Sequence, residues 1–372
     1  MDPVAVAAAG FVLALSLSRL LLRRRREHRQ TRRGQFTVRR CTGRDRAEVV
    51  GPLSKGVYTG VNGFCWDYLP YVFDRWLASD TKNMIVAVDR EQSAIVGLET
   101  ISIFDGGQTV MFQALRTRKS HQGRGVAKQL SRHAHQLVKT LAPHAHRLRT
   151  TTKWPENKPS VHIHVKQGYK PILYLPICGF ELSGQYDARR LQGYVDATGI
   201  RQISATALCH LLTKPCNQDL FPQRVMVVDW QAFSTDPETL RGNLAQLEAM
   251  ADDAAFWVGF EGSEAHGVLS SVSFGATKQV VSAYVHHCSI YVRSDRATVG
   301  PHGGLPQRPS DAVLAQFVSQ LSAHTLAAHA KSPRVATVKC FYEQHVEFGP
   351  GRDFWHSGPG GDSLRQTKPV IR

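Results

Sequence analysis

The chain is poor in cysteine and has no close cysteine pair. Its seven cysteines are scattered over 372 residues, and no two of them form a Cys-x-x-Cys pair. An odd number of dispersed cysteines in a chain of this size is typical of reduced thiols in a reducing compartment. We therefore expect neither a disulfide nor a metal site. The run His286-His287-Cys288 does not change this expectation, because it lies in a strand-like segment whose neighbouring side chains point to opposite faces.

Acidic residues are almost absent from the first 40 positions. This stretch holds ten arginines and, as acids, Asp2 and Glu27, so it contributes half of the formal net charge of +16. The chain has no C2H2 zinc-finger spacing, no RNP-like aromatic motif and no basic region followed by heptads. We therefore expect no nucleic-acid partner.

The stretch from Val4 to Leu22 is apolar except for two serines and Arg19, and four arginines follow it at once. About 19 such residues can span a bilayer as a helix, and arginines on its carboxyl side hold the rest of the chain in the cytosol. We expect residues 1–34 to be an apolar segment and a basic linker that anchor a cytoplasmic protein to a membrane through residues 4–22. A mitochondrial presequence and an unstructured start are the alternatives.

Hydrophobic periodicity predicts an α/β (α+β) fold. We expect strands at 36–40, 84–89, 94–104, 108–117, 147–152 and 170–176, and helices at 45–58, 71–78, 126–141 and 157–166. Three of these strands follow one another through short turns, which indicates a mixed, mostly antiparallel sheet. This order differs from that of a doubly wound nucleotide-binding fold.

A second cycle of elements follows the first. We expect strands at 225–228, 254–260, 268–274, 281–292 and 334–340, and helices at 237–251 and 312–330. The order of strand, helix, three strands, helix and strand resembles that of the first cycle, so we expect a degenerate repeat. We divide the chain into an amino-terminal segment (1–34), a first domain (35–185), a connector (186–220), a second domain (221–350) and a tail (351–372).

The segment Gln122-Gly123-Arg124-Gly125-Val126-Ala127 lies between a predicted strand and a predicted helix. Glycines let a backbone approach a ligand closely, and the amides and dipole at a helix amino terminus favour a pyrophosphate. Arg124 adds positive charge. The loop therefore predicts a site for a ligand that carries a pyrophosphate.

This loop resembles motif A of the GNAT superfamily of N-acetyltransferases, and the segment Asn157–Tyr169 resembles motif B. The resemblance implies a GNAT fold followed by a second GNAT-like domain, with acetyl-CoA as the co-substrate. It also implies that acetyl-CoA lies between the strands at 108–117 and 147–152. The residues implied to contact it are Leu115, Thr117, Gln122, Gly123, Arg124, Gly125, Val126, Ala127 and Asn157.

The resemblance has a departure at the catalytic acid. The family often has a tyrosine four residues before the motif B glycine, where it protonates the departing thiolate, and this chain has His164 there. Histidine donates a proton near neutral pH, so His164 is our candidate acid. The alternative is a partly buried helix residue without a chemical role.

Acetyl transfer needs a neutral amine, so a group must remove a proton from the substrate. Glu99 is our candidate base, because it lies in an apolar strand and apolar surroundings raise the pKa of a carboxyl group. The alternative places Glu99 on the solvent face of its strand. Gln113, in the next strand, cannot accept the proton, and we expect it to orient a water or the substrate.

A closer resemblance is to the vertebrate histidine N-acetyltransferase family. It is carried by Gly56–Tyr58, Asp67–Pro70, Leu98–Glu99, Asp105–Val110, Gly123–Ala127 and Asp229–Gln231. It implies direct acetylation, in a ternary complex, of the α-amine of a free amino acid, with L-histidine as the family's substrate. Asp67 and Tyr68 are our candidate substrate contacts, and the alternative is a helix cap followed by a packed ring.

Two further functions stay open at this point. The first is a GNAT enzyme that acts on a protein amino terminus or a lysine, with the basic tail as a docking arm. The second is an acyl-CoA-binding module without catalytic activity, which the departure at His164 and the amide at Gln113 would fit.

Overall fold

The computed structural model describes residues 35–55, 65, 67–152, 158–170, 172–173, 177–182, 188–249, 254–280, 283–293, 311–331, 335–342 and 364–366. The predicted anchor at residues 4–22 lies outside these ranges, so the anchor, the presequence and the localisation stay predictions. Among the helices that the structure describes, none is both long and apolar enough to cross a bilayer.

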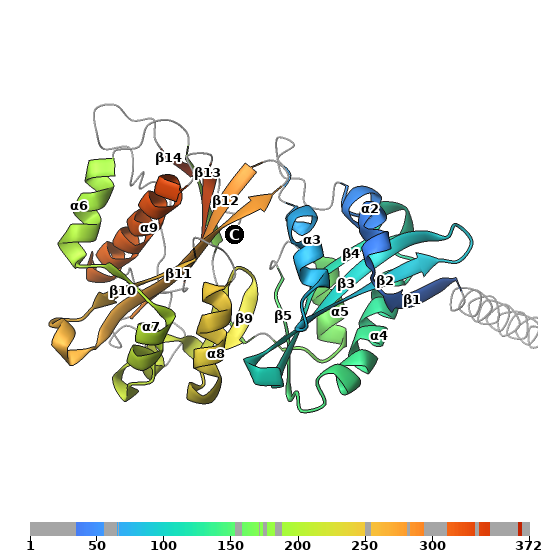
Figure 1. The fold of residues 1–372 in the computed structure, drawn as a ribbon, viewed down its shortest axis with the longest axis horizontal. Helices are drawn as coiled ribbons and strands as arrows, with labels where there is room; N and C mark the ends of the chain where they lie inside the picture. The colour runs from blue at the N-terminus through green and yellow to red at the C-terminus, as the bar shows by residue number, and fades with distance from the viewer. Residues whose placement is uncertain are drawn as a thin grey trace, which may run out of the picture. The chain divides into compact units, whose positions relative to one another are not determined.

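The described residues form two compact units. Unit 1 takes its residues from 1–57, 73–101 and 113–143, and unit 2 takes its residues from 58–72, 102–112 and 144–372. The division passes through two strands of the first sheet, which Figure 1 shows in blue to teal.

The first sheet has five strands in the order β1-β2-β3-β4-β5. The strands are β1 (Phe36–Arg40), β2 (Lys82–Asp89), β3 (Ala94–Phe104), β4 (Thr109–Thr117) and β5 (Arg147–Thr150). β1 runs antiparallel to β2, whereas β4 and β5 run parallel. The predicted mixed sheet is confirmed. β3 is buried along nearly its whole length, as expected of a strand that is covered on both faces.

Helix α4 (Val126–Leu141) buries one stripe of side chains. Val126, Leu130, Ala134 and Val138 recur at helical spacing and are all buried. The helix packs on β1 and β2. It also lies close to β3, because a Cβ atom added to Gly97 would lie 2.6 Å from Val126 and 2.8 Å from Leu130. The buried stripe and Gly97, which has no side chain, allow α4 to pack closely on β3.

Two predicted elements of the first part need correction. The helix expected at 45–58 is present over 46–53, as α2 (Arg46–Glu48) and a π-helical turn at Val49–Leu53 that contains Pro52, and residues 56–58 lie outside the described residues. The prediction of a strand at 170–176 is wrong for the described residues 170, 172 and 173, which are not in a strand. The next strand, β6 (Ile177–Leu182), begins later. Pro171 and Pro176 lack the amide proton that a sheet ladder needs. By contrast, α3 (Leu69–Leu77) and α5 (Lys158–Lys166) match their predictions closely.

The second sheet has seven strands in the order β14-β6-β13-β12-β11-β10-β7. After β6 come β7 (Arg201–Ile203), β10 (Ala255–Phe260), β11 (Leu269–Val280), β12 (Ala283–Val292), β13 (Val335–Tyr342) and β14 (Leu364–Gln366). Strands β10, β11 and β12 are antiparallel, and β13 lies parallel to β12 after helix α9 (Asp311–Lys331). This repeats β2, β3, β4, α4 and β5, so the predicted second GNAT-like domain is confirmed.

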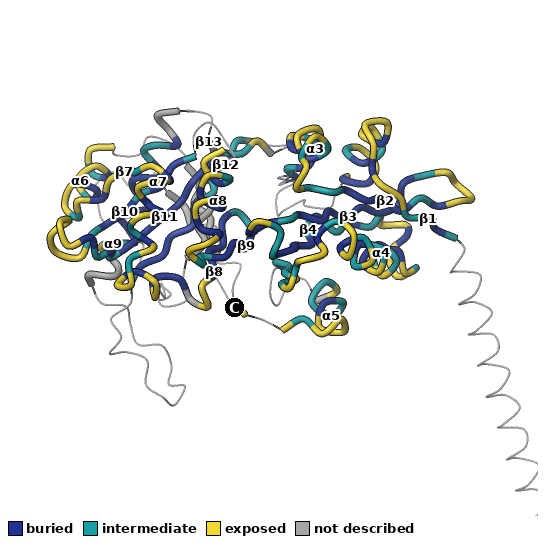
Figure 2. Tube along the Cα trace, turned by 60° about the horizontal axis from the view of Figure 1, so that its bottom comes forward, coloured by how far each residue is buried: buried dark blue, intermediate teal, exposed yellow. Residues whose placement is uncertain are grey.

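Three further helices and a small hairpin lie in the described part of unit 2. The helices are α6 (Ala188–Thr198), α7 (Ala205–Leu212) and α8 (Pro237–Glu248), and α6 packs on α9. β8 (Val225–Val228) and β9 (Gln231–Ser234) pair with each other in a sheet of their own. The predicted strand at 225–228 thus exists but does not join the seven-stranded sheet. Figure 2 shows buried backbone along the central strands and exposed residues on the outer faces of the helices.

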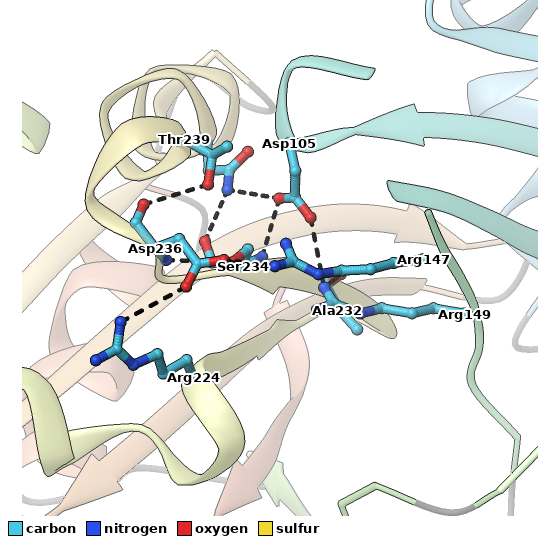
Figure 3. Close-up of polar contacts among 9 residues, drawn as sticks. Asp105, Arg147, Arg149, Arg224, Ala232, Ser234, Asp236 and Thr239 are labelled. Atoms are coloured by element: carbon cyan, nitrogen blue, oxygen red, sulfur yellow. Dashed lines mark hydrogen bonds and ion pairs between the residues drawn. The ribbon is translucent and has the colours of Figure 1, made fainter. Parts of the chain in front are cut away.

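Asp105, in the turn between β3 and β4, binds β9 and α8 within unit 2 (Figure 3). Its buried carboxylate accepts hydrogen bonds from the Ser234 amide at 2.9 Å and from Asn243 Nδ2 at 2.7 Å. Its second oxygen lies 3.5 Å from Arg149 Nη1, which also donates to the Ala232 carbonyl at 2.8 Å. One buried acid therefore accepts hydrogen bonds from β9 and α8 and lies beside the charge of Arg149 on β5.

Candidate functional site

The glycine loop before α4 has the conformation that its sequence predicts. Gly123 has φ +73° and Gly125 has φ +90°, a left-handed region that favours glycine. A Cβ atom added at either position would meet nothing within 4 Å, so open space surrounds both residues. Gly125 directly precedes α4, whose first amides have no partner within the helix. The loop thus offers open space and helix amides to an anion.

The start of the loop is fixed by a buried pair. His121 Nε2 lies 3.1 Å from Asp89 Oδ2, and both side chains are buried. Although burial opposes ionisation of Asp89, hydrogen bonds from the Glu91 amide and from His121 hold its pKa below the ordinary value. Sequence reasoning did not find this pair. The available signal was an acid at the end of an apolar strand and a histidine just before the glycines.

β4 carries Leu115 and Thr117 beyond the part that pairs with β5. Its pairing with β5 joins Thr109–Phe112 to Arg147–Thr150. Ala114 then adopts φ +56°, which costs a residue with a side chain about 1–3 kcal/mol. Such strain is concentrated at functional sites, and nothing in the local sequence predicts it. Gln122 Nε2 reaches the Thr117 carbonyl at 3.5 Å, so the structure brings these two predicted contacts together.

Glu99 is a buried acid in β3. The residue is 1% exposed, which excludes the alternative of a solvent-facing carboxylate. Its Oε2 atom has no hydrogen-bond partner within the described part of the chain. Burial raises the pKa of Glu99 to about 8. A carboxyl group with such a pKa can exchange a proton with an amine near neutral pH. Gln113 lies on the neighbouring β4 and is half-buried.

His164 lies in α5 and is buried. Its Nε2 atom is 3.3 Å from Thr150 Oγ1, at the end of β5. Its ring meets that of Tyr169 edge to face, with centroids 5.4 Å apart. The histidine is thus held between β5 and the end of motif B. Asn157 lies outside the described residues.

Asp67 and Tyr68 precede α3. Asp67 is buried, and its Oδ1 accepts a hydrogen bond from the Leu69 amide at 3.0 Å, as a residue that caps a helix does. Tyr68 is half-buried, and Lys278 Nζ lies 5.9 Å from the centre of its ring. The cap that we weighed as an alternative for Asp67 is therefore present, and Tyr68 is the more accessible of the two.

The predicted residues divide between the two units. Unit 1 holds Glu99, Gln113, Leu115, Thr117 and the loop Gln122–Ala127, and unit 2 holds Asp67, Tyr68 and His164. In unit 1 the arrangement can bind an anion and exchange a proton. In unit 2, His164 lies on α5 beside the end of β5, and the ring of Tyr68 lies just before α3.

Comparison with known proteins finds a family model and several curated relatives that match part of the chain. Residues 57–169 match the family model of the acetyltransferase (GNAT) family. The chain is 28% identical over 232 residues to a histidine N-acetyltransferase of Scomber australasicus, an alignment that covers 59% of this chain and 66% of the relative. It is 27% identical over 230 residues to a histidine N-acetyltransferase of Oreochromis niloticus, covering 59% and 65%. The chain therefore spans slightly less than two thirds of the length of these relatives.

Among solved structures, a tandem GNAT protein from the clavulanic acid biosynthesis pathway aligns with 84% of this chain and 91% of its own, at 13% identity and a TM-score of 0.49.

Proposed function

We propose that this chain, which carries an acetyltransferase domain of the GNAT family in residues 57–169, transfers the acetyl group of acetyl-CoA to the α-amine of a free amino acid. L-Histidine is the proposed acceptor, since the aligned relatives are named histidine N-acetyltransferases. The observation that carries the proposal is the buried Glu99 on β3, in the same unit as the open, left-handed glycine loop.

The residues of unit 1 fit acetyl-CoA. The amides of Gln122–Ala127 would hold the pyrophosphate, with the help of the Arg124 charge, because glycines at positive φ leave no side chain in the way. The backbone of Leu115 and Thr117, beyond the part of β4 that pairs with β5, would hold the pantetheine arm. Asn157 remains a proposed contact from the resemblance.

The chemical step needs one base and one acid. Glu99 takes a proton from the substrate ammonium, directly or through a water, and Gln113 orients that water or the substrate. The neutral nitrogen then attacks the thioester carbonyl, a C–N bond forms, the C–S bond breaks and the nitrogen releases its second proton to solvent. His164 gives a proton to the departing thiolate. Free amino acids have an ammonium group at neutral pH, so a base with a pKa of about 8 suits the first transfer.

Tyr68 is the proposed contact for the acceptor side chain. Its ring is half-buried, and a phenol ring can stack on an imidazole. Asp67 caps α3 and thereby fixes the turn that presents Tyr68. We assign Asp67 a positioning role in substrate binding.

The test is acetyl-CoA turnover by the full chain with a panel of free amino acids, amino-terminal peptides and lysine peptides. We expect acetylhistidine as the main product and weak turnover of peptides. Faster acetylation of peptides would instead support a protein-directed enzyme. Acetyl-CoA binding without turnover of any acceptor would support a binding module.

A further inference from the structure

The turn between β8 and β9 has an unusual sequence for its shape. β8 and β9 pair up to Val228 with Gln231, so Asp229 and Trp230 form a two-residue turn. Their φ angles are +48° and +66°, as in a type I′ turn, where Asn-Gly is strongly favoured. Aspartate is among the residues favoured at the first position, but a tryptophan at the second costs stability, and strained backbone is concentrated at functional sites.

The turn is held firmly from two sides. The buried Tyr291 phenol, on β12, accepts from the Val227 amide at 2.6 Å and donates to the Val227 carbonyl at 3.1 Å. Thr151 Oγ1, just after β5, donates to the Trp230 carbonyl at 2.6 Å. Thr150 next to it contacts His164. The turn is therefore connected to His164, the proposed catalytic acid, through the neighbouring residues Thr151 and Thr150. All these residues belong to unit 2.

Asp229 is paired with two basic side chains. It forms an ion pair with Lys278 of β11, and its Oδ1 lies 3.1 Å from His287 Nδ1 of β12. His287 is paired in register with Ala276, two residues from Lys278 on β11, so the two basic side chains lie on the same face of the sheet. His286, which precedes His287 on β12, points to the opposite face and contacts Thr277. The alternation of side chains along β12 thus puts His287 on the face of the sheet where Asp229 lies.

The Lys278 ammonium also lies over the ring of Tyr68, at 5.9 Å from its centre. The side chains of Lys278, Asp229 and His287 are 19%, 9% and 10% exposed, so each is shielded from water without being sealed in the core. A cation in such a position attracts a carboxylate more strongly than a surface lysine does, because solvent screening is weaker. An ammonium carries three N–H donors, so it can bind Asp229 and a second carboxylate together.

We propose that Lys278, held in place by Asp229, binds the α-carboxylate of the acceptor amino acid and thereby selects free amino acids over peptides. The inference rests on the proposed function, because it places a ligand beside Tyr68, the proposed acceptor contact. In a peptide the first carbonyl is an uncharged amide, which forfeits the charge-assisted bond to the ammonium. Lys278 and His287 come from the second GNAT-like domain, so that domain takes part in substrate selection.

The experiment compares L-histidine with L-histidinamide, which lacks the carboxylate, on the full chain and on the variants Lys278→Met and Lys278→Arg. Turnover and calorimetric binding of both ligands are measured at saturating CoA or acetyl-CoA. Lys139→Met is the matched control, because Lys139 is an exposed residue of α4. Melting temperatures establish that each variant is folded.

We expect Lys278→Met to weaken histidine binding and kcat/KM by about 10- to 100-fold, the value of a hydrogen bond to a charged group. It should leave the binding and turnover of histidinamide and the KM for acetyl-CoA nearly unchanged. Lys278→Arg should retain most of the selectivity for histidine over histidinamide. Lys139→Met should behave as wild type. Equal losses for both ligands, or no loss for histidine, would overturn the role of Lys278 even if the wild type acetylates histidine. A wild type that binds histidine over histidinamide without acetylating it would overturn the proposed function and leave the carboxylate site standing.

Discussion

His121 Nε2 and Asp89 Oδ2 lie 3.1 Å apart in the core of unit 1, one at the entrance to the glycine loop and the other at the end of β2. The pair ties the loop that we propose as the pyrophosphate site to a largely buried strand. Preorganisation of this kind lowers the cost of ordering the loop when a ligand binds.

Gly125→Val should strongly reduce acetyl-CoA binding. At φ +90° a branched side chain is strained, and it would stand where the pyrophosphate approaches the amides of α4. The measurement is the Kd of acetyl-CoA by calorimetry. Gly107→Val is the control, because Gly107 has φ +93° and the same open surroundings but lies in the turn between β3 and β4. Equal affinities of the two variants would remove the basis for the loop assignment.

Glu99→Gln should lower kcat by about 100- to 10,000-fold, the usual contribution of a general base. Wild-type kcat should rise with pH up to about 8, since the base acts in its ionised form. The variant should lose that rise and keep its affinity for acetyl-CoA. A pH–rate profile from pH 6 to 9.5 tests this, and near wild-type turnover by the variant would return Glu99 to a structural role.

The same residue should affect stability with the opposite trend in pH. Burial raises the pKa of Glu99 from its ordinary 4.5 to about 8. Between these values the native carboxyl keeps a proton that the unfolded chain releases, so the free energy of unfolding falls as pH rises. Glu99→Gln should flatten this fall. Urea unfolding at pH 5.5 and pH 8.5 measures it, and an unchanged slope in the variant would contradict the raised pKa.

His164→Phe should lower kcat by about 100-fold or more while leaving acetyl-CoA affinity intact, because it removes the proposed proton donor and keeps a ring against Tyr169. His164→Tyr, which restores the residue that the family often has there, should recover much of the rate. The contrast between the two variants is the test. If both variants turn over as fast as the wild type, the imidazole carries no chemical role.

Asp105→Ala should destabilise the protein by about 3–5 kcal/mol, since it leaves the Arg149 charge and two buried donors without their acceptor. Asp74→Ala is the comparison, because the Asp74–Arg46 pair is exposed and should contribute about 0–1 kcal/mol. Both values come from denaturant unfolding. Similar small losses in the two variants would show that the buried contacts of Asp105 add little.

The sequence predicted most strands and the glycine loop before α4. Both are signalled locally, the strands by alternating polar and apolar residues and the loop by its glycines. α4 and its stripe from Val126 to Val138 follow directly from spacing. Asp67 shows a limit of this reasoning, since a helix cap and a substrate carboxylate require the same residue type at the same position.

Features that depend on long-range contacts were not predicted. The approach of Asp229 to Lys278 joins residues on different hairpins, and the left-handed Ala114 depends on its surroundings in the sheet. The family resemblance included Asp229–Gln231 but did not indicate which partners the turn would meet.

The position of β6 limits how the two halves of the chain could be recombined with those of other proteins. It follows α5 in sequence, yet it lies between β13 and β14 in the second sheet. A gene fragment that begins after residue 182 would encode a β13 with a bare edge, open to association with other chains. Recombination that exchanges the first half for that of another enzyme must therefore bring a strand that fits β13. The first half of the chain thus encodes a strand that the second sheet needs.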